Sequence, residues 1–357
     1  MPVVVFLALL AALGLLLVLA GRRDGDLPAR LVSAVADRLP EHRREWGPAM
    51  VAELTQVRGR VRRWRFAAGA LRVLLFPPPH RGRVVVVAAV GLAVAAAATV
   101  SAAREVPTLS VFAGTLGLLL CACATLAAAH WPRRRPGAPY VAVATLALAA
   151  AVATVATLVR VAVLHPSATA DGTHVFSVLF AVVLAGYLAV ALIPPRAGGR
   201  ANALLLWALA AALAGGAVWI AIAATVPADP SGITGLMSPV SAAAVLLASV
   251  GAAATTGSMP AGARAGVLTV ALTAPIHFAA DIGGVLHLGH YTLTDPYDVA
   301  AFARGGYPDV ASFLLSDQLG GEIVSGFVLY PVALLALALL GAAAGTRLDR
   351  FRIRRAA

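Results

Sequence analysis

Residues 84–103 read "VVVVAAVGLAVAAAATVSAA", a run of 20 residues without a charged side chain. A helix of about 20 apolar residues is long enough to cross the hydrocarbon core of a bilayer. Comparable runs recur along the chain, which is 60% hydrophobic and only 12% charged, whereas soluble domains are about 25% charged. The sequence therefore predicts an all-α, polytopic transmembrane helical bundle.

We predict about nine membrane spans. The first, residues 1–20, is expected to be a retained anchor rather than a cleaved signal, because a signal peptide begins with a positively charged region and this segment has none. Eight further spans form a membrane domain over residues 84–344. They lie near 84–103, 108–130, 140–163, 175–194, 202–226, 238–256, 266–288 and 323–344.

The placement of arginine predicts the orientation of these spans. All 28 basic residues are Arg, and basic residues favour cytoplasmic loops. With the N-terminus outside and the C-terminus inside, 25 of the 28 arginines lie in cytoplasmic segments, chiefly residues 21–83 and the tail 345–357. The outside loops, of which 289–322 is the longest, are then mildly acidic and include Glu322. We expect a multi-pass protein of the plasma membrane, and its Ala-, Val- and Arg-rich composition is typical of a bacterial chain.

Residues 21–83 are expected to form a cytoplasmic module of three short helices: about 28–38, a second beginning at Pro48, and about 60–75. The third places a set of apolar residues on one stripe: Val61, Trp64, Ala68, Leu71 and Leu75. A basic amphipathic helix with Trp on its apolar face is the form that lies in a membrane interface. The residues expected to contact a membrane or a partner are Trp46, Arg58, Arg62, Trp64, Arg65 and Arg72.

Three interpretations of this module remain open. It could be a passive topological anchor, a helical bundle that docks a cytoplasmic protein, or a lipid-sensing or autoinhibitory element. The net charge of +12 favours contact with anionic inner-leaflet lipid. No motif that reads a nucleic-acid groove is present, so we expect no nucleic-acid partner.

The stretch "LPEHRREWGPAMVAELTQVRGRVRRWRFAAGALRVLL", residues 39–75, resembles a module of uncharacterised actinobacterial multi-pass membrane proteins. Its pattern is LP, an Arg/Glu-rich turn, W-x-x-A-M-x-A-E-L and an Arg-rich W-R-F-A-x-G helix. It is also loosely similar to the helical prefix of some bacterial permeases and membrane sensors. The resemblance implies an integral membrane protein and no particular activity.

Ionisable residues inside spans are costly and are candidates for function. His277 and Asp281 are four residues apart in the eighth predicted span and therefore share a helix face. Arg160 lies at a comparable depth in the fourth span, so we expect it to pair with Asp281, while His277 bonds to Asp281 or lines a polar cavity. This cluster could hold helices together or handle a proton or a substrate.

A metal site is a weaker alternative at the same place, because His277, Asp281, His287 and His290 offer the ligand atoms that zinc accepts. No HExxH-type pattern supports it. Beyond this cluster, two short helices beginning near Asp298 and Asp309 are expected in the loop 289–322, either as a lid over a cavity or as an ordered surface cap.

These observations favour a non-enzymatic accessory or regulatory membrane protein that works through its cytoplasmic module. The main alternative is a small-solute or proton-coupled permease that uses Arg160, His277 and Asp281. A membrane enzyme with an outward-facing His/Asp site is the third hypothesis. No motif predicts a cofactor.

Overall fold

The computed structural model describes residues 28–29, 32–33, 46–75, 81–130, 137–170, 174–192, 199–225, 230–288, 293 and 295–356. Throughout these residues the regular structure is helical. The helices are α3 (Trp46–Gln56), α4 (Arg60–Leu75), α5 (Arg81–Glu105), η3 (Pro107–Leu109), α6 (Ser110–His130), α7 (Ala138–Leu164), α8 (Pro166–Ala170), α9 (His174–Leu192), α10 (Gly199–Thr225), α11 (Pro230–Thr256), α12 (Met259–Leu288), α13 (Pro296–Gly305), α14 (Val310–Gly321), η4 (Glu322–Leu329) and α15 (Tyr330–Ala356).

Seven helices in the described residues are long and apolar enough to cross a membrane, and the shorter apolar helix Phe176–Leu192 lies between two of them. These segments occupy the positions of the eight spans predicted over residues 84–344, and the all-α bundle is confirmed. The predicted first span, 1–20, lies outside the described residues. The chain is a multi-pass helical membrane protein by the length and composition of these helices.

Several helices extend beyond the membrane spans that the sequence predicted. The candidate span in α12 begins at Met259 rather than near 266, whereas in α11 the candidate span Pro239–Thr256 matches the predicted 238–256, although the helix itself begins at Pro230. α15 continues to Ala356, so most of the predicted tail 345–357 is helical. Hydropathy marks only the part of a helix that suits hydrocarbon, whereas backbone hydrogen bonding continues into the polar flanks.

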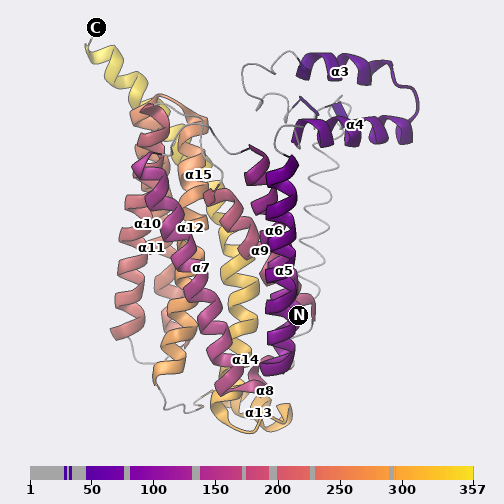
Figure 1. Ribbon diagram of the computed structural model, residues 1–357. Coiled ribbons are helices and arrows are strands. Elements are labelled where there is room, and N and C mark those ends of the chain that lie inside the picture. Colours follow the sequence, from indigo (N-terminus) through magenta and orange to yellow (C-terminus); the bar gives the residue numbers. More distant parts are fainter. Residues whose placement is uncertain are drawn as a thin grey trace. The chain divides into compact units, whose positions relative to one another are not determined.

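The chain divides into two compact units, Met1–Gly91 with Cys121–Trp131, and Leu92–Leu120 with Pro132–Ala357. In the first, α3 and α4 pack together as the α3–α4 module (Figure 1). α3 begins at Trp46, two residues before the predicted start, because Pro48 within the first turn removes no intrahelical hydrogen bond. Gly59, at φ 93°, makes the left-handed turn into α4, whose bounds match the prediction.

In the second unit, α12 lies at the centre of the bundle. It contacts α7, α9, α10, α11, α14, η4 and α15. In the span Met259–His287, 72% of the most apolar stretch is buried inside the protein, against 33% for Ala138–Leu164. Figure 1 shows α7, α10, α11, α12 and α15 running alongside one another, with α8, α13 and α14 gathered at one end.

Small residues bring α11, α12 and α15 close together. A Cβ added to Gly341 or Gly345 on α15 would meet α11 at Ser249 or Ala253. A Cβ on Gly266 of α12 would meet Ser249 and Ala338. Close backbone approach through small residues is the usual way in which membrane helices pack. The Gly341–Gly345 pair therefore serves packing within this chain.

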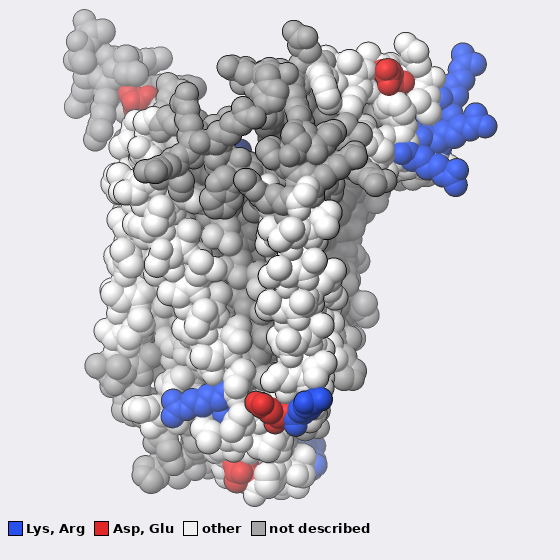
Figure 2. All heavy atoms as spheres, viewed as in Figure 1, with Lys and Arg blue, Asp and Glu red and all other residues white. Residues whose placement is uncertain are grey.

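The two short helices predicted near the outer loop are present as α13 and α14. Asp309 caps α14, since its Oδ1 accepts from Ser312 N at 2.7 Å. α13 is capped by Asp295, whose Oδ1 accepts from Tyr297 N at 2.8 Å, and the predicted Asp298 lies within its first turn. The side of the bundle in Figure 2 is largely uncharged, and blue and red side chains gather at the end that carries α13 and α14.

Candidate functional site

Two buried carboxyl groups, Asp281 and Glu322, meet inside the bundle, and we call them the carboxyl pair. Asp281 lies on α12 and is 6% exposed; Glu322 begins η4 and is 8% exposed. Their side chains lie within hydrogen-bonding reach of each other, where α12 contacts η4. Asp281 Oδ2 is buried and accepts no hydrogen bond from the residues that the structure describes. Charged groups are expensive in this setting, so the pair is the leading candidate for function.

Glu322 corrects the sequence interpretation, which placed it in an outside loop. It is buried, and the helix that begins at Val310 continues through it into α15. The sequence did contain a signal, because Glu322 directly precedes the apolar run "IVSGFVLY" that was taken as the ninth span. A carboxylate at that border can lie on either side of the boundary, and only the packing against Asp281 places it within the bundle.

Glu322 is positioned by an unusual backbone. η4 is a π-helix in which Tyr330 N–H bonds to the Ser325 carbonyl, five residues earlier. The Phe327 carbonyl accepts a hydrogen bond from Tyr187 Oη at 2.5 Å. A Cβ on Gly326 would overlap Glu322 Oε2, so only Gly leaves room for this side-chain conformation. Single-turn π-segments within α-helices occur frequently at functional sites.

His277 does not bond to Asp281, which was one of the two arrangements that the sequence left open. Its ring stacks on Trp219 of α10 with centroids 4.3 Å apart. Ser241 Oγ of α11 lies 3.4 Å from its Nδ1, which is the long end of hydrogen-bond range. His277 therefore joins α10, α11 and α12, while Asp281 one turn later faces η4.

Arg160 is not brought to Asp281. It lies on an exposed face of α7, and Asp281 is instead bonded to Glu322. The prediction compared depths along two helices, but depth does not determine which way a helix face points. An Arg near the end of a span can extend its long side chain toward the interface, which removes the need for a buried partner.

The candidate metal ligands do not assemble. His287 is exposed near the end of α12, whereas Asp281 is buried, and His290 lies outside the described residues. Among the described residues, no group of three or more His, Cys, Asp or Glu could hold a metal ion. His277 and Asp281 alone supply too few ligands for zinc.

A Ser, a His and an Asp come together beside α14, but not in catalytic order. Ser312 Oγ donates to Asp309 Oδ2 at 3.1 Å and lies 3.4 Å from His165 Nδ1. In a nucleophilic triad the His lies between the Ser and the Asp. Here the buried Ser312 lies between them, so the contacts tie the end of α7 to the cap of α14.

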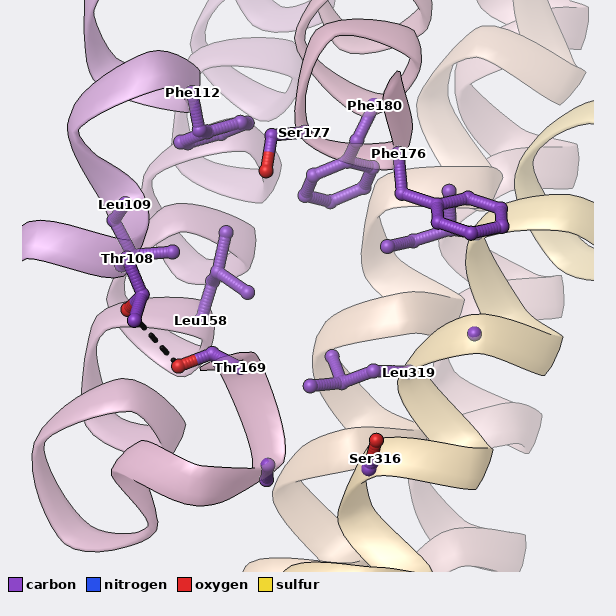
Figure 3. Close-up of a pocket in the computed structure, with 13 residues that line it drawn as sticks. Thr108, Leu109, Phe112, Leu158, Thr169, Phe176, Ser177, Phe180, Ser316 and Leu319 are labelled. Carbon is purple, nitrogen blue, oxygen red and sulfur yellow. Dashed lines mark hydrogen bonds between the residues drawn. The ribbon is translucent and has the colours of Figure 1, made fainter. Parts of the chain in front are cut away.

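A cavity of about 160 Å³ lies at the same end of the bundle, between η3, α6, α7, α8, α9 and α14 (Figure 3). Phe112, Phe176 and Phe180 form much of its wall, and Thr108 and Thr169 are hydrogen-bonded at 3.0 Å on one side. Ile323 lines it, although its neighbour Glu322 does not. The cavity suits a small apolar group and is separate from the carboxyl pair.

The α3–α4 module carries the second candidate surface. Its core consists of Val32, Leu54, Ala67 and Ala70. On α4, Val61 is 67% exposed and Trp64 is 40% exposed, so this described part of the predicted stripe is not used by the core. The side chains of Leu71 and Leu75 lie outside the described residues. Trp46 is also exposed, at 44%. Of the predicted basic residues, Arg58, Arg62 and Arg65 are exposed, whereas the side chain of Arg72 lies outside the described residues.

The core of the module turns one face of α4 inward, and the apolar stripe lies on another. At about 100° per residue, Val61 lies about 180° around the helix from Ala70, Ala68 lies about 100° from Ala67, and Trp64 lies between Ala67 and Ala68. Arg62 and Arg65 lie beside the stripe, both on the same side of it. We call Val61, Trp64 and Ala68 the α4 stripe.

No protein-family model, curated protein or solved structure matches the chain. The fold defines the class, a multi-pass helical membrane protein.

Proposed function

We propose that this protein is a non-enzymatic accessory or regulatory component of the membrane, whose α3–α4 module lies on anionic lipid through the α4 stripe. The observation that carries the proposal is that α4 has two apolar faces and its own core covers only one. An exposed Trp beside arginines matches an interface in which apolar rings enter the headgroup layer and cations meet anionic lipid.

Charge supports lipid over a protein as the occupant. The module bears Arg58, Arg62 and Arg65 on its exposed surface. The stripe of Val61, Trp64 and Ala68 lies beside Arg62 and Arg65 on α4. Each basic residue near an anionic leaflet contributes on the order of 1 kcal/mol of attraction. A cytoplasmic protein partner stays the alternative outcome of the test.

The same proposal includes the topology: nine spans, the N-terminus outside, the C-terminus inside, and residence in a bacterial plasma membrane. The distribution of arginine supports it, since 25 of 28 fall on one side. Within the bundle, Gly257 after α11 approaches Asp349 near the end of α15, so the arginine-rich end of α15 lies at the end of the bundle opposite α13. Accessibility of single cysteines to an impermeant reagent, introduced at Asp298 and at Asp349, tests the orientation.

The lipid contact is tested by fluorescence in nanodiscs. Trp64→Cys, in a chain that also carries Cys121→Ala and Cys123→Ala, is labelled with a polarity-sensitive dye. We expect a blue shift in nanodiscs containing phosphatidylglycerol and none in phosphatidylcholine alone, because the arginines require anionic headgroups. Thr55→Cys, exposed on α3, is the matched control.

Neutralising the two arginines beside the α4 stripe makes the same experiment more specific. Arg62→Gln with Arg65→Gln should remove most of the shift at position 64 while leaving the module folded, since both side chains are exposed. Equal emission in the two lipids would contradict the proposal. A lipid-independent shift lost on purification from native membranes would indicate a protein partner instead.

A proton-coupled permease is the second candidate function, and the buried carboxyl pair favours it. Protonatable residues at this depth recur in proteins that move ions or solutes. Proton flux into liposomes containing the protein, driven by a pH gradient and compared with Glu322→Gln, tests it. Equal flux through the two proteins removes this candidate.

A further inference from the structure

We propose that Asp281 and Glu322 form a proton-binding site in the membrane domain, which holds one proton shared between the two carboxyl groups. The inference is independent of the lipid contact of the α3–α4 module. It supplies the binding site that the permease alternative would need.

The closeness of two buried carboxyl groups favours a proton shared between them. Two carboxylates offer only acceptor oxygens, so a hydrogen bond between them needs one to be protonated. Two negative charges at this separation in a water-poor interior would repel strongly, as in paired carboxyl groups that share one proton. The shared form therefore carries a single negative charge.

In the described part of the bundle, no basic side chain forms a salt bridge with Asp281 or Glu322. Few ionisable side chains occur on the elements packed against α12. They are Tyr140 and Arg160 on α7, His174 and Tyr187 on α9, Arg200 on α10, Asp317 on α14, and Tyr330 followed by the charged C-terminal end on α15; α11 has none. On α12 itself, His277 faces Trp219 and Ser241.

The Tyr187 hydroxyl is a hydrogen-bond donor on α9, but it does not donate to the carboxyl pair. It donates to the Phe327 carbonyl. Arg160 is exposed on α7, and Arg264 and His287 lie toward the two ends of α12. Among the described residues, the ion pair that the bundle does form joins His165 and Asp309, away from the carboxyl pair.

A second observation marks the place as a binding site. Asp281 Oδ2 is buried and unpartnered, in a chain segment where a polar atom normally finds a partner. That oxygen is an open acceptor beside the shared proton. Loss of the proton to water as hydronium would leave two carboxylates, whose repulsion would push Glu322 off Gly326 and strain η4.

A proton fits the site better than a metal ion. Sodium or a divalent cation needs several oxygen ligands, and the described residues provide no third carboxylate, His or Cys beside the pair. A proton needs only the two oxygen atoms that already meet. The chemical class of ligand is therefore the proton, and sodium becomes one arm of the test.

Infrared titration of the full-length protein in nanodiscs tests the proposal. We expect a carbonyl band from a protonated carboxyl group at neutral pH, which disappears in alkaline buffer. Asp281→Asn with Glu322→Gln should abolish the band. Asp317→Asn, which changes an exposed carboxyl on α14, should leave it unchanged.

The single variants Asp281→Asn and Glu322→Gln sharpen the assignment, because an amide N–H can replace the shared proton as donor to the remaining carboxylate. Each should therefore lose the band as completely as the double variant. Hydrogen exchange in η4 should rise in alkaline buffer in the native protein and not in the double variant.

Three outcomes would overturn the proposal. One is the absence of a protonated-carboxyl band in the native protein at neutral pH. This measurement does not depend on whether a variant folds. Another is a double variant with the native spectrum. The last is a band that sodium removes at fixed pH, which would make the site a cation site. None of these outcomes affects the fluorescence test of the α4 stripe.

Discussion

In the α3–α4 module apolar side chains face outward, and at the centre of the bundle carboxyl groups face inward. Both arrangements are costly for the isolated chain. The α4 stripe exposes Trp64 and Val61 although the module has a core, and the carboxyl pair buries two acidic groups although the bundle is otherwise apolar. The comparison teaches that each region needs something beyond its own side chains. The α4 stripe lacks an apolar neighbour, and the carboxyl pair, as we propose, needs a proton.

The largest loss of stability is expected in the aromatic centre of the bundle, which has neither exposed apolar side chains nor buried carboxyl groups. Phe180 contacts Phe112, Phe278 and Phe327 at centroid distances of 5.3, 4.7 and 4.8 Å. Phe180→Ala should lower the free energy of unfolding by about 3–5 kcal/mol, the usual cost of emptying such a site. Denaturant unfolding in detergent measures it, and Val152→Ala, at a position 68% exposed, is the control.

The module's own core should come next. Leu54 is fully buried, so Leu54→Ala should destabilise the α3–α4 module by about 2–5 kcal/mol. Trp64→Ala should change the local stability far less, because the ring lies outside that core. Hydrogen exchange in α3 and α4 of the detergent-solubilised chain distinguishes the two. Equal exchange in both variants would mean that the α4 stripe belongs to the core after all.

Breaking the carboxyl pair should cost less than emptying the aromatic centre. Asp281→Leu removes one side of the hydrogen bond and should cost about 1–3 kcal/mol, because Glu322 is left buried without its partner. Replacing both carboxyls by Leu should be tolerated better than either single change, as for other buried polar pairs. A double-mutant cycle on thermal unfolding measures the coupling, and zero coupling would separate the two residues.

Gly326→Ala should have the smallest effect on stability and a specific effect on the site. The added Cβ would displace the end of the flexible Glu322 side chain, which costs little because that end can shift, and better helix propensity offsets part of this cost. The infrared band of the shared proton should weaken or shift. Gly283→Ala, two residues after Asp281 with open space around its Cβ, is the matched control. Identical spectra from the two variants would exclude Gly326 as the residue that positions Glu322.

The candidate site was only half predictable. His277 and Asp281 stood out because they interrupt an apolar run, and hydropathy detects such residues wherever they occur. Glu322 escaped because it lies at the border of its run, and Arg160 was assigned to Asp281 from depth alone. Which faces meet depends on the rotation of each helix, and that is set by the packing of small residues such as Gly266 against α11 and α15.

The sequence by itself determined that this chain is a helical membrane protein, where most of its spans lie, that Asp309 caps a short helix, and that α4 is amphipathic. Each of these follows from local patterns: the length of an apolar run, a capping side chain and a period of 3.6 residues. Only the tertiary structure decided that Glu322 meets Asp281, that Arg160 faces away, and that the α4 stripe is left outside its own core. These depend on which helix surfaces pack together, and a local sequence pattern does not specify the distant segment that packs against it.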